Sequence, residues 1–179
     1  MKYLLLAGIL FLASAANAQT DYCTEFGKVI KMMENGFTAA KATKGAESTT
    51  NYGIMMLTKK SWTSNYKFPE SQTAEITETL RDAPDPKLAG HNVYISFNLA
   101  KNITKDAAVA IFNKMKDKVK GCTPANWKLK ENGGNTYLHY MIFDGAFYDE
   151  SAHKVTLQYN KMEGSDKYTA DIIFDVAVK

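Results

Sequence analysis

The sequence predicts an α+β protein in which two helices pack on one face of a curved, largely antiparallel β-sheet. Two segments carry apolar residues at steps of three and four, which is the helical period, and others alternate apolar and polar residues, which is the strand period. The segments follow the order helix, strands, helix, strands, and short turn signals rather than helical crossovers separate the strands. This order also suggests a pseudo-duplicated domain.

The composition is typical of a globular domain and excludes several classes of protein. Of the 179 residues, 45% are hydrophobic and 23% are charged, and the formal net charge is +3. These fractions exclude disordered and fibrous chains. Nucleic acid is not an expected partner, because Arg81 is the only arginine and arginine is the residue best suited to bidentate recognition of phosphates and bases.

The first 18 residues have the pattern of a secretory signal peptide. Lys2 supplies a positive charge, residues 4–12 form an apolar run, and Ala16-Asn17-Ala18 is a small-residue cleavage site. A membrane helix is the alternative, but it needs about 20 apolar residues. We therefore expect cleavage after Ala18, a single α+β domain over residues 19–179, no transmembrane segment, and a secreted or periplasmic protein.

The two cysteines are predicted to form a disulfide bond, because an exported protein folds in an oxidising compartment. Each cysteine extends the apolar stripe of a predicted helix. One stripe is Cys23, Phe26, Ile30 and Met33, and the other is Ala108, Phe112, Met115, Val119 and Cys122. We expect the bonded helices to lie side by side and antiparallel. A catalytic thiol is the alternative, and it would need a nearby base.

Local signals mark the helix ends. Thr104 can cap the second helix, and Gly121 ends it. The first helix begins at Thr20 or Asp21 and meets a stop signal at Asn35-Gly36, but residues 37–44 leave its end open.

The clearest strands are those in which an apolar residue recurs at every second position, over residues 93–99, 155–159 and 168–178. Residues 137–143 are apolar on both faces, which predicts a central strand with cover on both sides. Weaker strands are expected at 52–58, 66–68, 73–80 and 127–130.

No catalytic motif occurs in the sequence, so the sequence does not indicate an enzyme. The chain has no nucleophile elbow, no metalloprotease motif, no P-loop and no dinucleotide fingerprint. We expect neither a cofactor nor a metal site. The candidates for a hydrolytic enzyme are Glu78, His139 and His153, and they would have to converge in one pocket. Glu78 shares a strand face with Ile76, so it is either buried with a raised pKa or solvated at a strand edge.

The remaining hypothesis concerns the surface of the sheet. Two helices can cover only one face, so the other face is open or curled around a cavity. We therefore expect an exported binding or interaction module whose ligand is an unknown small molecule, lipid or exported protein. Tyr94, Tyr140 and Met55 are the expected contact residues. The alternative is an inhibitor or immunity-type protein that acts on an exported enzyme.

Overall fold

An open sheet of eight antiparallel strands forms the centre of the molecule. The computed structural model describes residues 21–134, 137–143 and 153–178. The strands follow the order β1-β2-β3-β4-β8-β7-β6-β5, and the helices pack on one face, which confirms the predicted α+β class. The elements after the first helix (residues 21–33) are η1 (Thr38–Ala40), β1 (Lys41–Asn51), β2 (Met56–Ser64), β3 (Thr73–Asp82), β4 (Gly90–Ile103), α2 (Lys105–Cys122), β5 (Lys128–Gly133), β6 (Tyr137–Phe143), β7 (Lys154–Lys161) and β8 (Tyr168–Ala177).

The topology repeats itself in two halves. The strands β1 to β4 follow the first helix, the strands β5 to β8 follow α2, and each half forms a meander of neighbouring antiparallel strands. The halves join where β4 pairs with β8. The strand order therefore has the symmetry that a duplicated arrangement would give, although the two halves share no sequence pattern that we can detect.

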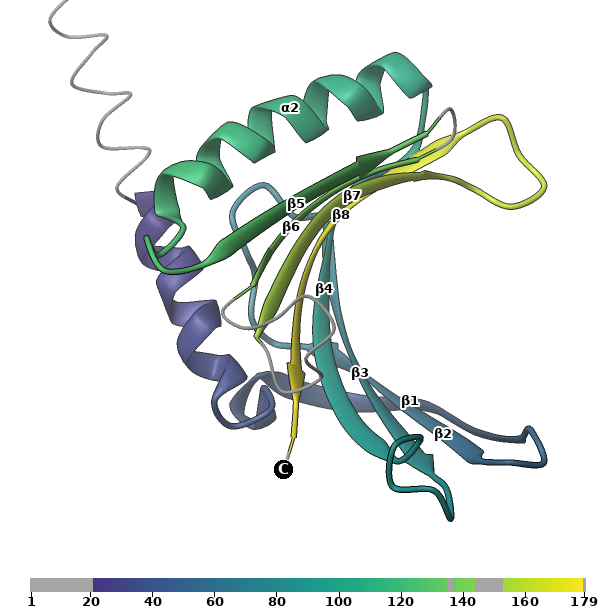
Figure 1. Ribbon diagram of the computed structural model, residues 1–179. Coiled ribbons are helices and arrows are strands. Elements are labelled where there is room, and N and C mark those ends of the chain that lie inside the picture. Colours follow the sequence, from purple (N-terminus) through teal and green to yellow (C-terminus); the bar gives the residue numbers. More distant parts are fainter. Residues whose placement is uncertain (1–20, 135–136, 144–152, 179) are drawn as a thin grey trace, which may run out of the picture.

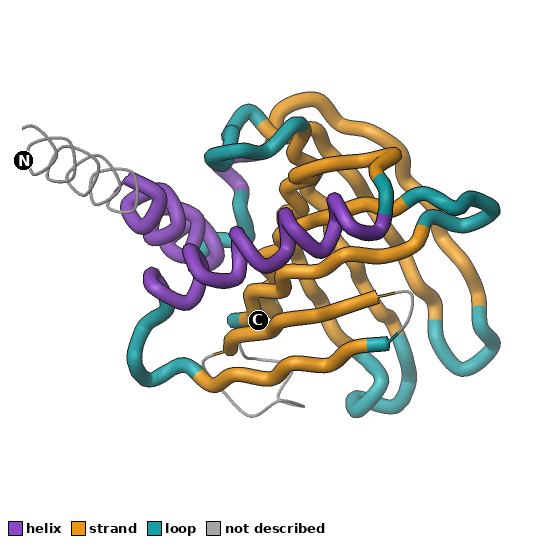
Figure 2. The backbone as a smooth tube through the Cα atoms, turned by 90° about the horizontal axis from the view of Figure 1, so that it is seen from above, coloured by secondary structure: helices purple, strands orange, loops and turns teal. Residues whose placement is uncertain are grey.

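The hydrophobic core lies between the helices and the convex face of the sheet (Figures 1 and 2). Alternate residues of β4 and β8 point into it, because successive side chains of a strand point to opposite faces. Phe26 of the first helix packs against Phe174 of β8, with ring centroids 5.3 Å apart, and Phe112 of α2 packs against Tyr159 of β7 at 5.9 Å. Both helices are thus anchored to the same face.

A disulfide bond between Cys23 and Cys122 confirms the predicted bridge, and their Cα atoms are 5.0 Å apart. The side-chain oxygen of Thr104 accepts a hydrogen bond from the Ala107 backbone N–H, which is the predicted N-cap of α2. The two helices meet at their bonded ends and then diverge over the sheet (Figure 1). The expectation of side-by-side antiparallel helices is wrong, because the bridge fixes only one end of each helix.

Irregular pairing bends the sheet. The register shifts twice between β1 and β2 and twice between β4 and β8, and Asn102 near the second pair of shifts has φ = 61°. A bulged strand bends and twists more strongly than a regular one. The result is a curved sheet whose concave face points away from the helices (Figure 1).

Four segments differ from the sequence-based expectations. Residues 41–51, whose state was left open or unassigned, form the edge strand β1, and the strand expected at 52–58 begins only at Met56. The strand expected at 66–68 is wrong, because these residues lie in the connection between β2 and β3. Residues 137–143 form a strand, but β6 lies next to the edge strand β5 rather than at the centre. The proposed signal peptide falls outside the described residues. Within the described part of the chain, no helix is long and apolar enough to cross a membrane.

Candidate functional site: the concave face of the sheet

The concave face is predominantly polar. Within the described residues, no helix lies over it (Figure 1). Its two central strands present two aliphatic side chains, Ile173 and Ala177, among polar ones. The side chains that β4 and β8 direct to this face are Asn92, Tyr94, Ser96, Asn98, Thr169, Asp171, Ile173, Asp175 and Ala177. The expected uncovered face therefore exists, but its chemistry favours hydrogen bonding over apolar contact.

One part of this face is a hydrogen-bonded group around Asp171. Asn98 Nδ2 donates to Asp171 Oδ1 at 2.8 Å and to Thr169 Oγ1 at 2.9 Å, and the Thr169 hydroxyl donates to Asp171 Oδ2 at 3.1 Å. Burial raises the pKa of Asp171, and the hydrogen bonds from Asn98 and Thr169 offset part of this effect. The group borders a hollow of about 470 Å³ that also includes Lys101 and Gln72. It is an ordered, partly dehydrated carboxylate beside open space.

A second carboxylate, Asp175, lies in a less satisfied environment. It stands between Tyr94 of β4 and Lys154 of β7 in the cross-strand register. Burial raises its pKa, against the opposing effects of Lys154, a hydrogen bond with Asn92, and Arg81. Its Oδ1 atom is buried and accepts no hydrogen bond within the described residues. A buried acceptor without a donor is unfavourable, so this atom is suited to a donor that arrives from outside.

The side chains around Asp175 form the wall of a small hollow of about 250 Å³. Arg81 Nη2 donates to Asn92 Oδ1 at 3.2 Å, which orients the Asn92 amide toward the carboxylate. Tyr94 and Thr79 complete the wall with hydroxyl groups. The hollow is therefore lined by two cationic, three neutral polar and one anionic side chain: Arg81, Lys154, Thr79, Asn92, Tyr94 and Asp175.

Asp171 and Asp175 do not form a catalytic pair. They are four residues apart on one strand, which separates them by about 13 Å at about 3.3 Å per residue. Paired carboxylates in glycoside hydrolysis lie between about 5 and 9.5 Å apart. The spacing suits two contact points for one extended ligand better than joint acid and base chemistry.

The structure separates the three contact residues expected from the sequence. Tyr94 lies on the concave face beside Asp175. Tyr140 is buried on the opposite, helix-covered face, where the Lys116 ammonium lies 5.3 Å from its ring. Met55 lies in the turn between β1 and β2, at the end of the sheet. Tyr140 cannot reach the concave face, because its neighbour in the register is the buried Leu157, and this corrects the expectation that it lines that face.

Glu78 belongs to a charged group on the other face of the sheet. Its carboxylate accepts a hydrogen bond from Lys41 Nζ at 3.1 Å and lies 2.6 Å from His91 Nε2. Burial raises the pKa of Glu78, but the interactions with Lys41 and His91 outweigh it and hold the pKa below its ordinary value. The sequence placed Glu78 correctly on the face of Ile76, whereas a raised pKa is not found. Its partners lie 37 and 13 residues away, so no local pattern could reveal them.

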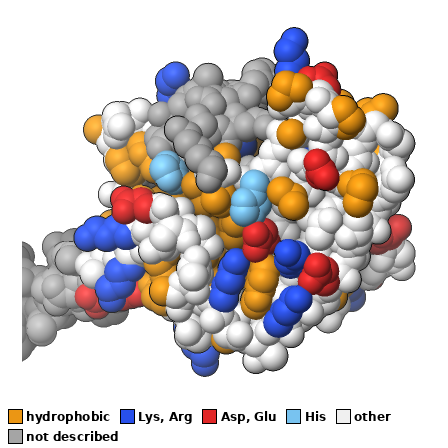
Figure 3. All heavy atoms as spheres, turned by 90° about the horizontal axis from the view of Figure 1, so that it is seen from below, with side chains coloured by type: hydrophobic (Ala, Val, Ile, Leu, Met, Phe, Trp, Pro, Cys, Tyr) orange, Lys and Arg blue, Asp and Glu red, His pale blue; other side chains and the backbone are white. Residues whose placement is uncertain are grey.

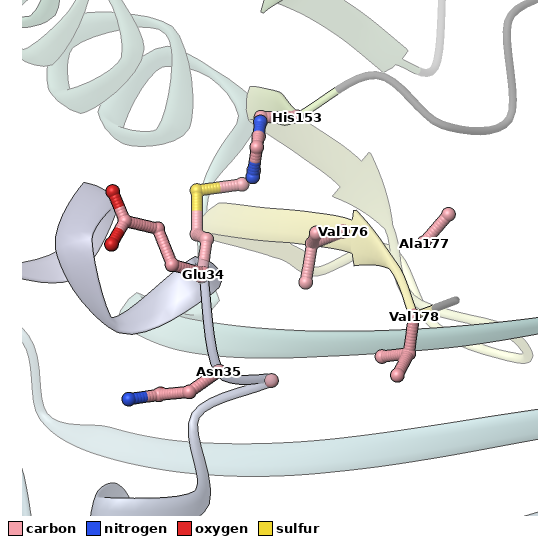
Figure 4. Close-up of a pocket in the computed structure, with 8 residues that line it drawn as sticks. Glu34, Asn35, His153, Val176, Ala177 and Val178 are labelled. Atoms are coloured by element: carbon pink, nitrogen blue, oxygen red, sulfur yellow. The ribbon is translucent and has the colours of Figure 1, made fainter.

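The two other candidate acid–base residues lie elsewhere. His139 is on the concave side of β6, with its Nε2 atom 3.5 Å from Asn160 Oδ1. His153 borders a hollow of about 590 Å³ between the end of the first helix and the end of β8. In that hollow the Glu34 carboxylate points away from His153, and Val176 and Val178 form an apolar side (Figure 4). Glu78, His139 and His153 therefore do not converge in one pocket.

The described residues contain no group of three or more histidine, cysteine, aspartate or glutamate side chains that could hold a metal ion. Comparison with known proteins finds no matching family model, no significantly similar curated protein and no significantly similar solved structure. The structure therefore shows an α+β protein whose helices lie on the convex face of the sheet. Within the described residues, the concave face is polar and no helix covers it.

Proposed function

We propose that the protein is an exported binding module that holds a polar ligand on the concave face of its sheet. The observation on which this depends is Asp175, a half-buried carboxylate whose Oδ1 atom has no donor within the described residues. A ligand amine or hydroxyl group that donates to this atom would remove the unfavourable state of a buried acceptor. Export is inferred from the leader-like first 18 residues, and the disulfide bond is compatible with it.

The two carboxylates suggest the shape of the ligand. Asp171 already has two internal donors, so it can accept a further hydrogen bond only at a remaining lone pair. Asp175 has a free acceptor position, so it is the stronger contact. Tyr94 lies beside Asp175 and offers a ring and a hydroxyl group. We therefore expect an elongated ligand with a donor group at one end, over Asp175, and further polar groups toward Asp171.

The first test is native mass spectrometry of the protein purified from its exported fraction, followed by mass analysis of what denaturation releases. The expected result is a small molecule that co-purifies with the wild type, is depleted in Asp175→Asn and is retained in Asp166→Asn. Asp166 is the matched control because it is an exposed aspartate in the turn between β7 and β8.

Two outcomes count against the proposal. A bare wild-type protein, or a molecule retained equally by both variants, would show that Asp175 does not hold a ligand. A second polypeptide in place of a small molecule would favour an inhibitor or immunity-type protein.

A further inference from the structure

The hollow beside Asp175 also contains a lysine whose charge no neighbouring carboxylate balances. Lys154 of β7 lies directly opposite Asp175 of β8 in the register, and both side chains line the hollow of about 250 Å³. Side chains that face each other across two strands have Cβ atoms about 4.5 to 5.5 Å apart, which is close enough for opposite charges to pair. The ion pairs within the described part of the chain nevertheless include neither Lys154 nor Asp175.

Other lysines of this protein contact the carboxylates that lie near them. Lys41 Nζ is 3.1 Å from Glu78 Oε2, and Lys116 Nζ is 2.6 Å from Glu131 Oε2. Basic and acidic side chains also lie beside one another on the side of the molecule that is seen from below (Figure 3). The separation of Lys154 from Asp175 is therefore a property of the hollow and not of the surface as a whole.

Both charges in the hollow are partly removed from water. Lys154 and Asp175 are half-buried, and Asp175 Oδ1 is buried without a donor in the described residues. Burial raises the pKa of Asp175, and the Lys154 ammonium is the largest influence that opposes this effect, so the two groups interact through space. A half-buried ammonium without a counter-charge and a buried carboxylate oxygen without a donor are both unfavourable. A ligand that supplies an anion to one and a donor to the other would remove both penalties.

The size of the hollow limits the ligand group that can enter it. A water molecule takes up about 30 Å³ in the liquid, so a hollow of about 250 Å³ has room for roughly eight waters. This is enough for one small head group. The hydroxyl groups of Tyr94 and Thr79 and the amide of Asn92 line the same space, so the head group is surrounded by hydrogen-bonding side chains.

We propose that the ligand end over Asp175 is an amino acid or hydroxy acid group, whose carboxylate contacts Lys154 and whose ammonium or hydroxyl donor, on the adjacent carbon, contacts Asp175. This inference rests on the proposed function, because it concerns the ligand of the same site. Charge-assisted hydrogen bonds are about 2.5 to 2.9 Å long, so a group of this size can reach two side chains that face each other across neighbouring strands.

Simpler ligand groups suit the hollow less well. A donor without an acid would leave the Lys154 ammonium without a counter-charge. An acid without a donor would leave Asp175 Oδ1 unsatisfied and would bring a second carboxylate close to Asp175, where like charges repel. An acid with a donor on the adjacent carbon satisfies both side chains at once.

Four probes with three carbon atoms each test the proposal with the folded wild type. Lactate and alanine carry both groups, propionate lacks the donor, and propane-1,2-diol lacks the acid. Titration of isotope-labelled protein followed by NMR measures the dissociation constant of each probe at neutral pH. We expect lactate, alanine or both to bind at least about tenfold more tightly than propionate and the diol, because each missing contact is a hydrogen bond to a charged group. A difference between lactate and alanine distinguishes a hydroxy acid from an amino acid.

Two variants assign the contacts. Lys154→Gln should weaken binding of the two-group probes at least about tenfold and leave binding of the diol unchanged. Asp175→Asn should weaken the same probes to a similar extent without weakening propionate. Lys161→Gln is the matched control, because it removes the same charge from the exposed end of β7, outside the hollow, and should leave every dissociation constant unchanged. Thermal melting of each variant shows that it is folded.

The outcomes separate this inference from the proposed function. Equal binding of the diol and the two-group probes, lost in Asp175→Asn and kept in Lys154→Gln, would overturn the acid group and leave the proposed function intact. Binding lost in Lys154→Gln but kept in Asp175→Asn would overturn both. Absence of binding by every probe, or an equal loss with Lys161→Gln, would overturn the inference, and the co-purification experiment would then decide the proposed function independently.

Discussion

Removal of the disulfide bond should lower the stability of the protein by an amount that its position in the chain determines. Cys23 and Cys122 are 99 residues apart. In the chain-entropy model, a closed loop of this length stabilises the folded state by about 4.7 kcal/mol at 25 °C, because it restricts the unfolded chain. In a domain of this size, 1 kcal/mol shifts the melting temperature by about 2 to 4 °C. We therefore expect Cys23→Ser combined with Cys122→Ser to melt about 10 to 19 °C below the wild type.

The assay is thermal unfolding followed by circular dichroism, on three samples of the protein. The oxidised wild type gives the reference, and the wild type reduced by a phosphine shows the effect of the open bond with both sulfur atoms still present. The doubly substituted variant should match the reduced wild type to within a few degrees, because a serine replaces each partly buried cysteine at nearly the same volume.

The reasoning fails if the variant melts within about 3 °C of an oxidised wild type whose mass confirms the bond. That result would mean that the unfolded chain is already compact enough for the bond to restrict it little. A reduced wild type that is much more stable than the variant would instead assign the loss to packing around the sulfur atoms.

Three further changes test other parts of the structure. Because the pKa of Asp175 is raised in the folded protein, the folded state holds its proton more tightly, and stability is lost as the pH rises from the ordinary aspartate range through the raised pKa. Asp175→Asn should remove this loss and increase the free energy of unfolding by about 1 kcal/mol at neutral pH. Urea unfolding between about pH 4 and pH 7 measures the effect, and the same pH dependence in both proteins would contradict it. Phe174→Ala should cost about 3 to 5 kcal/mol in urea unfolding, because Phe174 is fully buried against Phe26, Phe68 and Phe97, and a cost below about 1 kcal/mol would show that this core contact is not needed. Thr104→Ala should cost about 1 kcal/mol through loss of the α2 cap, with no measurable cost if the Ala107 N–H is solvated in the folded state.

The strands that the sequence predicts best are the ones with one face in the core. In β4 and β8 an apolar residue recurs at every second position, and the structure confirms both strands. The edge strand β1 could not be predicted in this way, because all but its first residue are exposed and the strand therefore has no apolar period. Its stability comes from pairing with β2, which is a contact between distant residues.

The position of β6 shows a second limit. Its residues are apolar on both faces, which is also true of central strands. In the structure the covered face of β6 packs in the core with Tyr140 and Ile142, while Met141 lies on the concave side although the strand is next to the edge. Strand order depends on which strands meet across the two halves, and composition alone does not contain that information.

The key residues of the candidate site were missed, although a signal for them existed. Asp171 and Asp175 are charged residues on the face of β8 that points away from the core. The alternating pattern of the sequence predicts that Ile172 and Phe174, on the other face, lie in the core. Two aspartates on one side of a strand whose other side is fully apolar are a sequence signal for a polar site on that face. Their burial could not have been predicted, since it depends on the curvature of the sheet and on neighbours from β4 and β7.

The place of β8 in the sheet has a consequence for the time course of folding. It is the last strand in chain order, yet it lies between β4 and β7. A chain that emerges from its amino end exposes one unpaired edge of β4 until residues 168–177 are also available, and pairing between such distant segments is slow. The half made of β1 to β4 therefore cannot complete its core alone. Its strand order postpones completion of the core until nearly the whole chain is available.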